Sequence, residues 1–193
     1  MDNATRSERT RAAVIQAALT VIARDGAGKL TLDAIARESG ISKGGVMHQF
    51  RTKQAVLEAL LDHQVAHSDQ RTQAHLTKID PASGEANLQA QIAVLREVST
   101  DPTSVAYALV GAMAEDPHLL SIIRAAGEPK LQALKDEAQD GNMRDMALLR
   151  WVAARGLAIP ALMGMCPLTQ GERDRLFDLL QDGARWKGCK AAG

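Results

Sequence analysis

Apolar residues recur every three or four positions along most of the chain, which is the spacing of amphipathic helices. The first stripe runs through Val14, Ala17, Ala18, Val21 and Ile22. No stretch shows the strict alternation of a half-buried strand. We therefore predict an all-α protein of about nine helices, over residues 7–24, 32–39, 43–50, 53–77, 85–99, 103–115, 117–139, 142–165 and 169–186.

Local signals set the ends of these helices. Thr5 and Glu8 have the spacing of a capping box for the first helix, and Gly26 is placed to end it. Pro129 and Pro160 fall inside predicted helices, so we expect each to mark a kink or a break.

Charge divides the chain into two parts. Residues 1–55 carry nine Lys and Arg against five Asp and Glu, although the formal net charge of the whole chain is zero. We predict a boundary near residue 55, between a basic domain over residues 1–55 and a helical domain over residues 56–193. A basic head on an acidic body indicates that the head meets a polyanion, while chance is the alternative explanation of so small a difference.

Composition excludes several other classes. The N-terminus has no apolar signal core and no apolar run is long enough for a membrane span, so we expect a cytoplasmic protein without membrane contact. Aromatic residues are 3% of the chain, which disfavours stacking platforms for single-stranded nucleic acid. We find no nucleophile–base pair, no glycine-rich phosphate loop and no strong metal spacing. We therefore expect no enzyme activity, no cofactor and no metal.

Residues 31–50 have the pattern of two short helices joined by a turn at Gly40. The positions expected to face inward are apolar or small: Ile35, Ala36, Ile41, Val46 and Phe50. The positions expected to face outward are Lys43, Gly44, Gly45, Met47, His48 and, in part, Gln49. Glycines would let a DNA duplex approach the backbone, a methionine could touch thymine methyl groups, and polar tips could reach base edges or phosphates.

The helix starts support DNA binding. Thr31, Ser42 and Thr52 can each cap a helix, and helix starts offer free N–H groups to phosphate oxygens. Lys43 and Lys53 lie beside two of these starts, and we also expect backbone contacts from Arg51, Arg6 and Arg9. The alternative is an ordinary surface helix pair with solvated lysines.

The segment "LTLDAIARESGISKGGVMHQFRTKQAVLEALL" resembles the DNA-binding domain of the TetR family of bacterial transcriptional regulators. The resemblance implies a homodimer of nine-helix protomers, a palindromic double-stranded operator, a small-molecule effector pocket in the C-terminal domain, and usually repression. It implies DNA contacts at Thr31, Ser42, Lys43, Gly44, Gly45, Met47, His48 and Lys53.

The chain departs from the family at the tyrosine of the second short helix, where Met47 and His48 stand instead. His48 could replace that contact. Gln49 could pair with adenine if it points outward, or fill a slot against the first helix if it points inward.

Candidate pocket residues lie on apolar helix faces of the body. They are Tyr107, Met113, Met143, Met146, Trp151 and Met163, which are apolar and adaptable enough for a ligand but could equally be core. Arg150 or Arg155 could meet an effector carboxylate or an acidic partner across a dimer interface. A row of four residues recurs at every fourth position of the long fourth helix: His63, His67, Arg71 and His75. This row could line a pocket, hold a metal ion through a pair of histidines, or face solvent.

The last two helices of family members pack against those of a second protomer. The small residues Ala153, Ala154, Gly156, Ala158 and Ala161 would permit such packing, with Leu157 and Leu162 as fillers. The apolar stripe of the last helix adds Leu176, Phe177, Leu179 and Leu180.

We thus expect a regulator, most simply a repressor that leaves its operator when an effector binds. The alternatives are a regulator without a small-molecule effector, switched by a protein or acting as an activator, and a helical enzyme.

Overall fold

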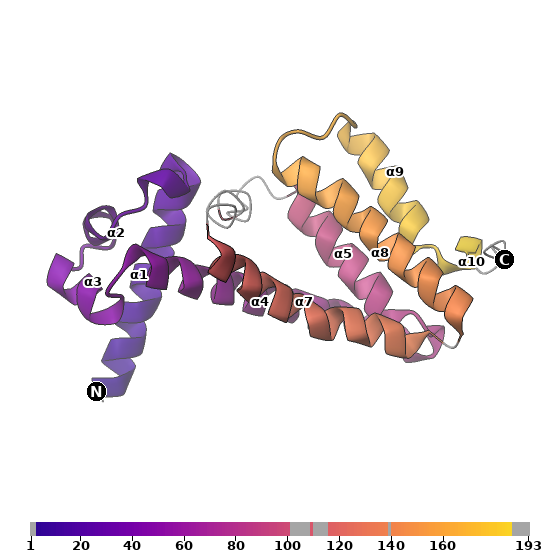
Figure 1. The fold of residues 1–193 in the computed structure, drawn as a ribbon, viewed down its shortest axis with the longest axis horizontal. Coiled ribbons are helices and arrows are strands. Elements are labelled where there is room, and N and C mark those ends of the chain that lie inside the picture. The colour runs from indigo at the N-terminus through magenta and orange to yellow at the C-terminus, as the bar shows by residue number, and fades with distance from the viewer. Residues whose placement is uncertain (1–2, 101–108, 110–115, 139, 187–193) are drawn as a thin grey trace. The chain divides into compact units, whose positions relative to one another are not determined.

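The computed structural model describes residues 3–100, 109, 116–138 and 140–186. These residues form nine α-helices, two short 3₁₀ turns and no strand (Figure 1). The predicted all-α class is confirmed within this part of the chain. The helix predicted over residues 103–115 lies outside the described residues, apart from Leu109.

The chain divides into two compact units. The first contains α1 (Asn3–Asp25), α2 (Leu32–Ser39), α3 (Lys43–Gln49), α4 (Lys53–Leu76) as far as Val65, and the start of α7 (Pro117–Glu137). Its core is formed by apolar side chains that include Val14, Ala18, Ile22, Leu30, Ile35, Val46, Phe50, Val56, Leu60 and Leu119. The predicted border after Ala55 falls inside this unit, because the first turns of α4 supply part of that core.

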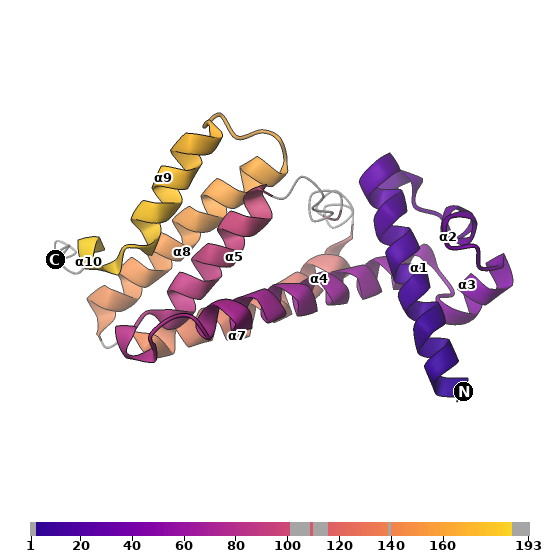
Figure 2. The same cartoon turned by 180° about the vertical axis from the view of Figure 1, so that it is seen from behind.

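The second unit contains the rest of α4 and α7, with α5 (Ala86–Thr100), α8 (Gly141–Leu162), α9 (Gln170–Gln181) and α10 (Gly183–Trp186). Helices α5, α8 and α9 lie side by side in both views (Figures 1 and 2). Together with Leu134 of α7 they form a shared core of Leu88, Ile92, Ala147, Ala154, Ala158, Phe177 and Leu180.

Three predictions of helix ends are wrong. Thr5 and Glu8 are no capping box, since α1 already begins at Asn3 and both residues lie within it. Neither Pro129 nor Pro160 breaks its helix, because α7 and α8 continue through them, at the cost of one backbone hydrogen bond each, and the alternative of a kink stays a prediction. The helix predicted over residues 169–186 is broken at Asp182 into α9 and α10.

Candidate nucleic-acid interface

Helices α2 and α3 begin at side-chain caps and are joined by a left-handed turn. The hydroxyl of Thr31 accepts a hydrogen bond from the N–H of Ala34 at 3.0 Å, and that of Ser42 accepts one from the N–H of Gly45 at 3.1 Å. Gly40 ends α2 with a φ of 68°, a conformation that costs glycine little. The predicted helix-turn-helix is therefore built from local signals.

Helix α3 has one buried and one exposed side. Val46 is fully buried and Phe50, just after the helix, is 3% exposed, so both anchor the helix to α1, α2 and α4. Met47, by contrast, is 45% exposed. The exposed side carries Lys43, Gly44, Met47 and His48. A short helix thus offers a cation, an open stretch of backbone, a thioether and an imidazole to its surroundings.

The two adjacent glycines have different surroundings. A Cβ on Gly44 would meet nothing within 4 Å, whereas one on Gly45 would lie 2.8 Å from Cγ2 of Ile41 and 3.3 Å from the hydroxyl of Ser42. Gly45 therefore serves the packing of the turn against α3. Only Gly44 leaves the backbone open to a large partner, so the two glycines do not act as one pair.

Gln49 points inward. Its Nε2 donates a hydrogen bond to the hydroxyl of Ser7 on α1 at 3.2 Å, and its side chain is half-buried. Beside it, the guanidinium of Arg11 lies over the ring of Phe50, 4.4 Å from the centroid. Of the two sequence interpretations, the inward one holds, because α1 offers the amide a partner.

Cations lie at two of the helix starts. Lys53 is the first residue of α4 and is exposed, and Thr52 before it caps the helix by accepting from the N–H of Ala55 at 3.1 Å. Lys43 is the first residue of α3, but its Nζ lies 3.0 Å from Oδ2 of Asp33 in the first turn of α2. Sequence reasoning missed Asp33. The available signal was an acid and a base in the first turns of consecutive helices.

A second charged contact ties α1 to α2 on another part of this unit. Arg24 of α1 makes ion pairs with Asp25 at 3.0 Å and with Glu38 in the last turn of α2 at 2.8 Å. Hydrogen bonds to Asp25 and then Glu38 raise the pKa of Arg24 above its usual value.

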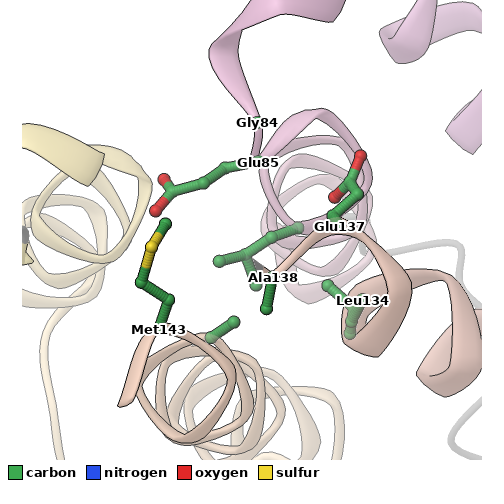
Figure 3. Close-up of a pocket in the computed structure, with 8 residues that line it drawn as sticks. Gly84, Glu85, Leu134, Glu137, Ala138 and Met143 are labelled. Carbon is green, nitrogen blue, oxygen red and sulfur yellow. The ribbon is translucent and has the colours of Figure 1, made fainter. Parts of the chain in front are cut away.

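The second unit contains a small cavity among α5, α7 and α8 (Figure 3). Leu88, Leu134 and Ala147 contribute apolar walls, while Glu85 and Glu137 contribute carboxylates. The space is about 10 Å³, enough for about one water molecule. The Glu137 carboxylate already accepts hydrogen bonds from the backbone and side-chain amides of Asn87, at 2.9 and 2.8 Å. As it stands, this cavity is too small for an organic effector.

Arg150 joins several elements of this unit. It is 1% exposed, its Nη1 lies 3.0 Å from Oε2 of Glu85, and its Nε donates to the carbonyl of Leu180 at 2.8 Å. Its guanidinium also lies 5.9 Å from the ring centroid of Trp186. Its acidic partner is thus Glu85 of its own chain, while its Nη2 is buried without a hydrogen-bond partner among the described residues.

The buried side-chain amide of Gln91 links α5, α7 and α8. Gln91 of α5 accepts a hydrogen bond from the indole N–H of Trp151 on α8 at 2.9 Å, and its own Nε2 donates to the carbonyl of Lys130 on α7 at 3.1 Å. The ammonium of Lys130 lies 2.8 Å from Oδ1 of Asp69 on α4. These polar contacts place Trp151 among the internal supports of this unit.

Two family models match the chain. One, described as bacterial regulatory proteins of the tetR family, covers residues 14–60, and the other, a tetracyclin repressor-like C-terminal domain, covers residues 85–185. The second match alone spans more than half of the chain. The chain belongs to the tetR family of bacterial regulatory proteins.

Relatives agree with this assignment. The HTH-type transcriptional regulator SrpR of Pseudomonas putida is 43% identical over 58 residues, which are 30% of this chain and 27% of SrpR. A transcriptional regulator from Rhodococcus sp. Rha1 superposes with a TM-score of 0.73 at 20% identity, over 95% of this chain and 99% of that one. A regulator from Saccharomonospora viridis, solved in complex with choline, superposes with a TM-score of 0.70 at 17% identity. The superposition covers 96% of this chain and 100% of that one.

The protein therefore combines the helix-turn-helix domain of the tetR family with a tetracyclin repressor-like C-terminal domain. The chain spans about a quarter of the length of SrpR, and the similar structures establish the fold alone. Within the described residues, no helix is both long and apolar enough to cross a membrane.

The candidate ligand residues of this TetR-family protein have mixed positions. Tyr107 and Met113 lie outside the described residues. Met146, Trp151 and Met163 are half-buried on or next to α8, and Met143 borders the small cavity. Ligand contact by these residues stays a prediction.

The histidine row on α4 is spread over different environments. His63 and His67 are exposed, while Nε2 of His75 lies 2.8 Å from Oε1 of Glu97 on α5. In the part of the chain that the structure describes, no cluster of His, Cys, Asp and Glu could hold a metal ion. Whether the row contacts a ligand stays open.

The predicted dimer residues differ in their exposure within the protomer, and their place in an interface stays a prediction. Phe177 and Leu180 are buried in the protomer's own core, because that face of α9 packs on α5 and α8. Ala154 and Ala158 are buried in the same core. Ala153 and Leu157 are half-buried and pack against this core, and Ala161 is half-buried as well. Leu176 alone among the predicted α9 residues is exposed.

The exposed apolar residues of α8 were missed. Leu149 is 55%, Val152 57% and Ile159 42% exposed, at the three- and seven-residue spacing of one helix face. The signal was present, since a helix apolar on all sides must have one face turned away from its own core.

Proposed function

We propose that this protein is a ligand-responsive repressor, which binds a palindromic operator as a homodimer and leaves it when a small-molecule effector binds. The observation that carries the proposal is the chemistry of α3, with an apolar underside buried in the head and Lys43, Gly44, Met47 and His48 exposed. These residues face solvent rather than the core of their own unit. An operator-binding protein works beside the chromosome, so we place it in the cytoplasm.

We assign the contacts on DNA as follows. The open backbone at Gly44 approaches the groove, Met47 touches thymine methyl groups, and His48 reaches a base edge or a phosphate in place of the family's tyrosine. Thr31 and Lys53 contact phosphates from the starts of α2 and α4. Ser42 and Gly45 act indirectly, by capping and packing α3, and Gln49 braces α3 against α1.

A second protomer supplies the partner for α8. The apolar face formed by Leu149, Val152 and Ile159 would be covered by the same face of another copy, with Leu176 of α9 at its border. A two-fold dimer presents two identical heads, which explains why the operator should be a palindrome.

The effector belongs in the second unit. Met146, Trp151 and Met163 offer an adaptable apolar lining, and Arg155 already lies over the Trp151 ring at 4.7 Å from its centroid, so that ring accepts cations. The choline complex of the Saccharomonospora viridis regulator and the malachite green complex of the multidrug binding protein EbrR make organic cations reasonable first probes. Since α4 supplies residues to both units, an effector that favours one arrangement of α4 would shift the heads.

DNA selection with the purified protein tests the proposal. The protein should enrich a palindromic duplex, and Lys53→Ala should weaken binding to all duplexes alike and lower the salt slope by about one per head, as expected of a phosphate contact. His48→Ala should change the preferred sequence or the affinity at the centre of each half-site. If no duplex is enriched at modest ionic strength, the proposed function fails.

A further inference from the structure

We propose that Asp33 is a positioning residue that competes with DNA phosphates for the ammonium of Lys43, and so limits the affinity of the head for duplex DNA. The proposal rests on the proposed function, since it requires that the α3 surface meets DNA. It concerns a residue that none of the DNA contacts assigned above includes.

The contact itself is direct. Nζ of Lys43 lies 3.0 Å from Oδ2 of Asp33, and both side chains remain solvent-exposed, at 56% and 62%. Asp33 stands in the first turn of α2, where the helix dipole favours a carboxylate, so its position is well supported without Lys43. Lys43 stands at the start of α3, beside the open backbone of Gly44. The carboxylate therefore lies on the side of the head that is to meet a polyanion.

Lys43 differs from its neighbours in this respect. Arg51 and Lys53 are also exposed near a helix start, but the described residues provide no ion-pair partner for either. Those two cations carry only mobile counterions, whose release into solution favours DNA binding. The counterion of Lys43 is part of the protein and cannot be released.

The consequence for DNA binding follows from charge alone. To reach a phosphate, the Lys43 ammonium must leave Asp33, whose unpaired carboxylate then stays close to the duplex. If the pair remains closed, Lys43 neutralises no phosphate. In either case Lys43 contributes less to DNA affinity than its charge would suggest. This loss of affinity is the same for every DNA sequence.

The test uses the full chain and fluorescence anisotropy with two labelled duplexes, one random and one selected operator, over a range of salt concentrations. Asp33→Asn keeps the size and hydrogen-bonding oxygen of the side chain but removes its charge. We expect about threefold tighter binding per head at low salt, and a salt slope steeper by about 0.9 per head, on both duplexes. Glu38→Gln is the matched control, because it removes an exposed, ion-paired carboxylate from the other end of the same helix.

A double-mutant cycle separates competition from simple removal of a negative charge. Lys43→Met should weaken binding little in the wild-type background and several-fold more in the Asp33→Asn background. Equal losses in both backgrounds would overturn the proposal. A change confined to the operator would also overturn it, and would assign Asp33 to base reading instead, since a carboxylate can accept from the cytosine amine.

The thermal midpoint of each variant, measured without DNA, shows whether the head remains folded. A wild-type protein that captures neither duplex would sink the proposed function as a whole. A wild-type protein that binds DNA but shows the same salt slope as Asp33→Asn would sink only the role of Asp33.

Discussion

Gly44 and Gly45 share a helix but face different surroundings, which makes them a matched pair for mutation. Alanine at Gly44 would project into open space, and it should stabilise α3 by up to about 1 kcal/mol through helix propensity. Alanine at Gly45 gains the same propensity but meets Ile41 at 2.8 Å, so the protein should be less stable than the Gly44→Ala variant. Thermal denaturation in the absence of DNA measures both.

The same two variants test how closely the backbone approaches the duplex. Gly44→Ala should bind the operator at least several-fold more weakly than wild type in spite of its greater stability, because a methyl group would stand between α3 and the groove. Unchanged affinity for the Gly44→Ala variant would show that α3 is not in close contact with DNA at this position.

For Arg150 we predict an effect of mutation on protein stability rather than on ligand binding. Arg150→Met removes one member of a buried ion pair and leaves the Glu85 carboxylate without its cation, so we expect a loss of about 3–5 kcal/mol in the free energy of unfolding. Urea denaturation measures the loss. The double variant with Glu85→Leu should lose much less than the sum of the two single losses, since no buried charge is then left unpaired. A loss below about 1 kcal/mol for Arg150→Met would contradict this role.

At the scale of single elements, α9 begins at a capping box in which Glu172 accepts from the N–H and the hydroxyl of Thr169, at 2.8 and 2.7 Å. The hydrogen bond from the hydroxyl, followed by that from the backbone, holds the pKa of Glu172 below its usual value. The carboxylate form is thus favoured in the folded state, and its stabilising effect is present above the unfolded pKa and is lost as the pH falls through the folded one.

We therefore expect Thr169→Ala to lower the thermal midpoint near neutral pH, and the difference from wild type to narrow as the solution is acidified below about pH 4. Thermal melts at a series of pH values measure this. Ser83→Ala, which removes a hydroxyl from a short turn without a capping box, is the comparison. A difference that stays constant across the pH range would mean that Glu172 takes no part.

Elements with signals within a few residues could be predicted well. Helix α2 has its predicted bounds, Leu32–Ser39, because Thr31 and Gly40 mark its two ends by side-chain and backbone chemistry of their own. The start of α1 was misplaced, since the residues before Thr5 are also able to continue a helix and the spacing of Thr5 and Glu8 does not show which end is used. The break at Asp182 depends on packing, because Gly183 lies against Glu85, far away in sequence.

At the scale of the whole molecule, the side-chain exposures predicted from local patterns agree with the structure, and contacts between distant residues could not be predicted. The exposed members of α3 follow from periodicity, and Lys43, Met47 and His48 are exposed as expected. What could not be predicted is pairing across the chain, such as Gln49 with Ser7 or Arg150 with Glu85. Periodicity identifies which face of a helix is apolar, but it does not say which of several apolar faces packs inside the protomer.

Helix α8 illustrates that choice and makes the last prediction. Its buried residues Ala147, Ala154 and Ala158 share one face, and Leu149 and Val152 lie on the opposite one, more than half exposed. An exposed apolar face of this kind is expected to bury itself against a second copy, as the proposed dimer requires. Val152→Glu would place a charge in the centre of that contact. We expect it to convert the dimer to monomer in sedimentation velocity and to weaken operator binding by at least tenfold, while the thermal midpoint of the monomer stays measurable.

Arg144→Glu, an exposed change on another face of α8, should remain dimeric. A Val152→Glu protein that sediments as a dimer would move the interface away from this face of α8.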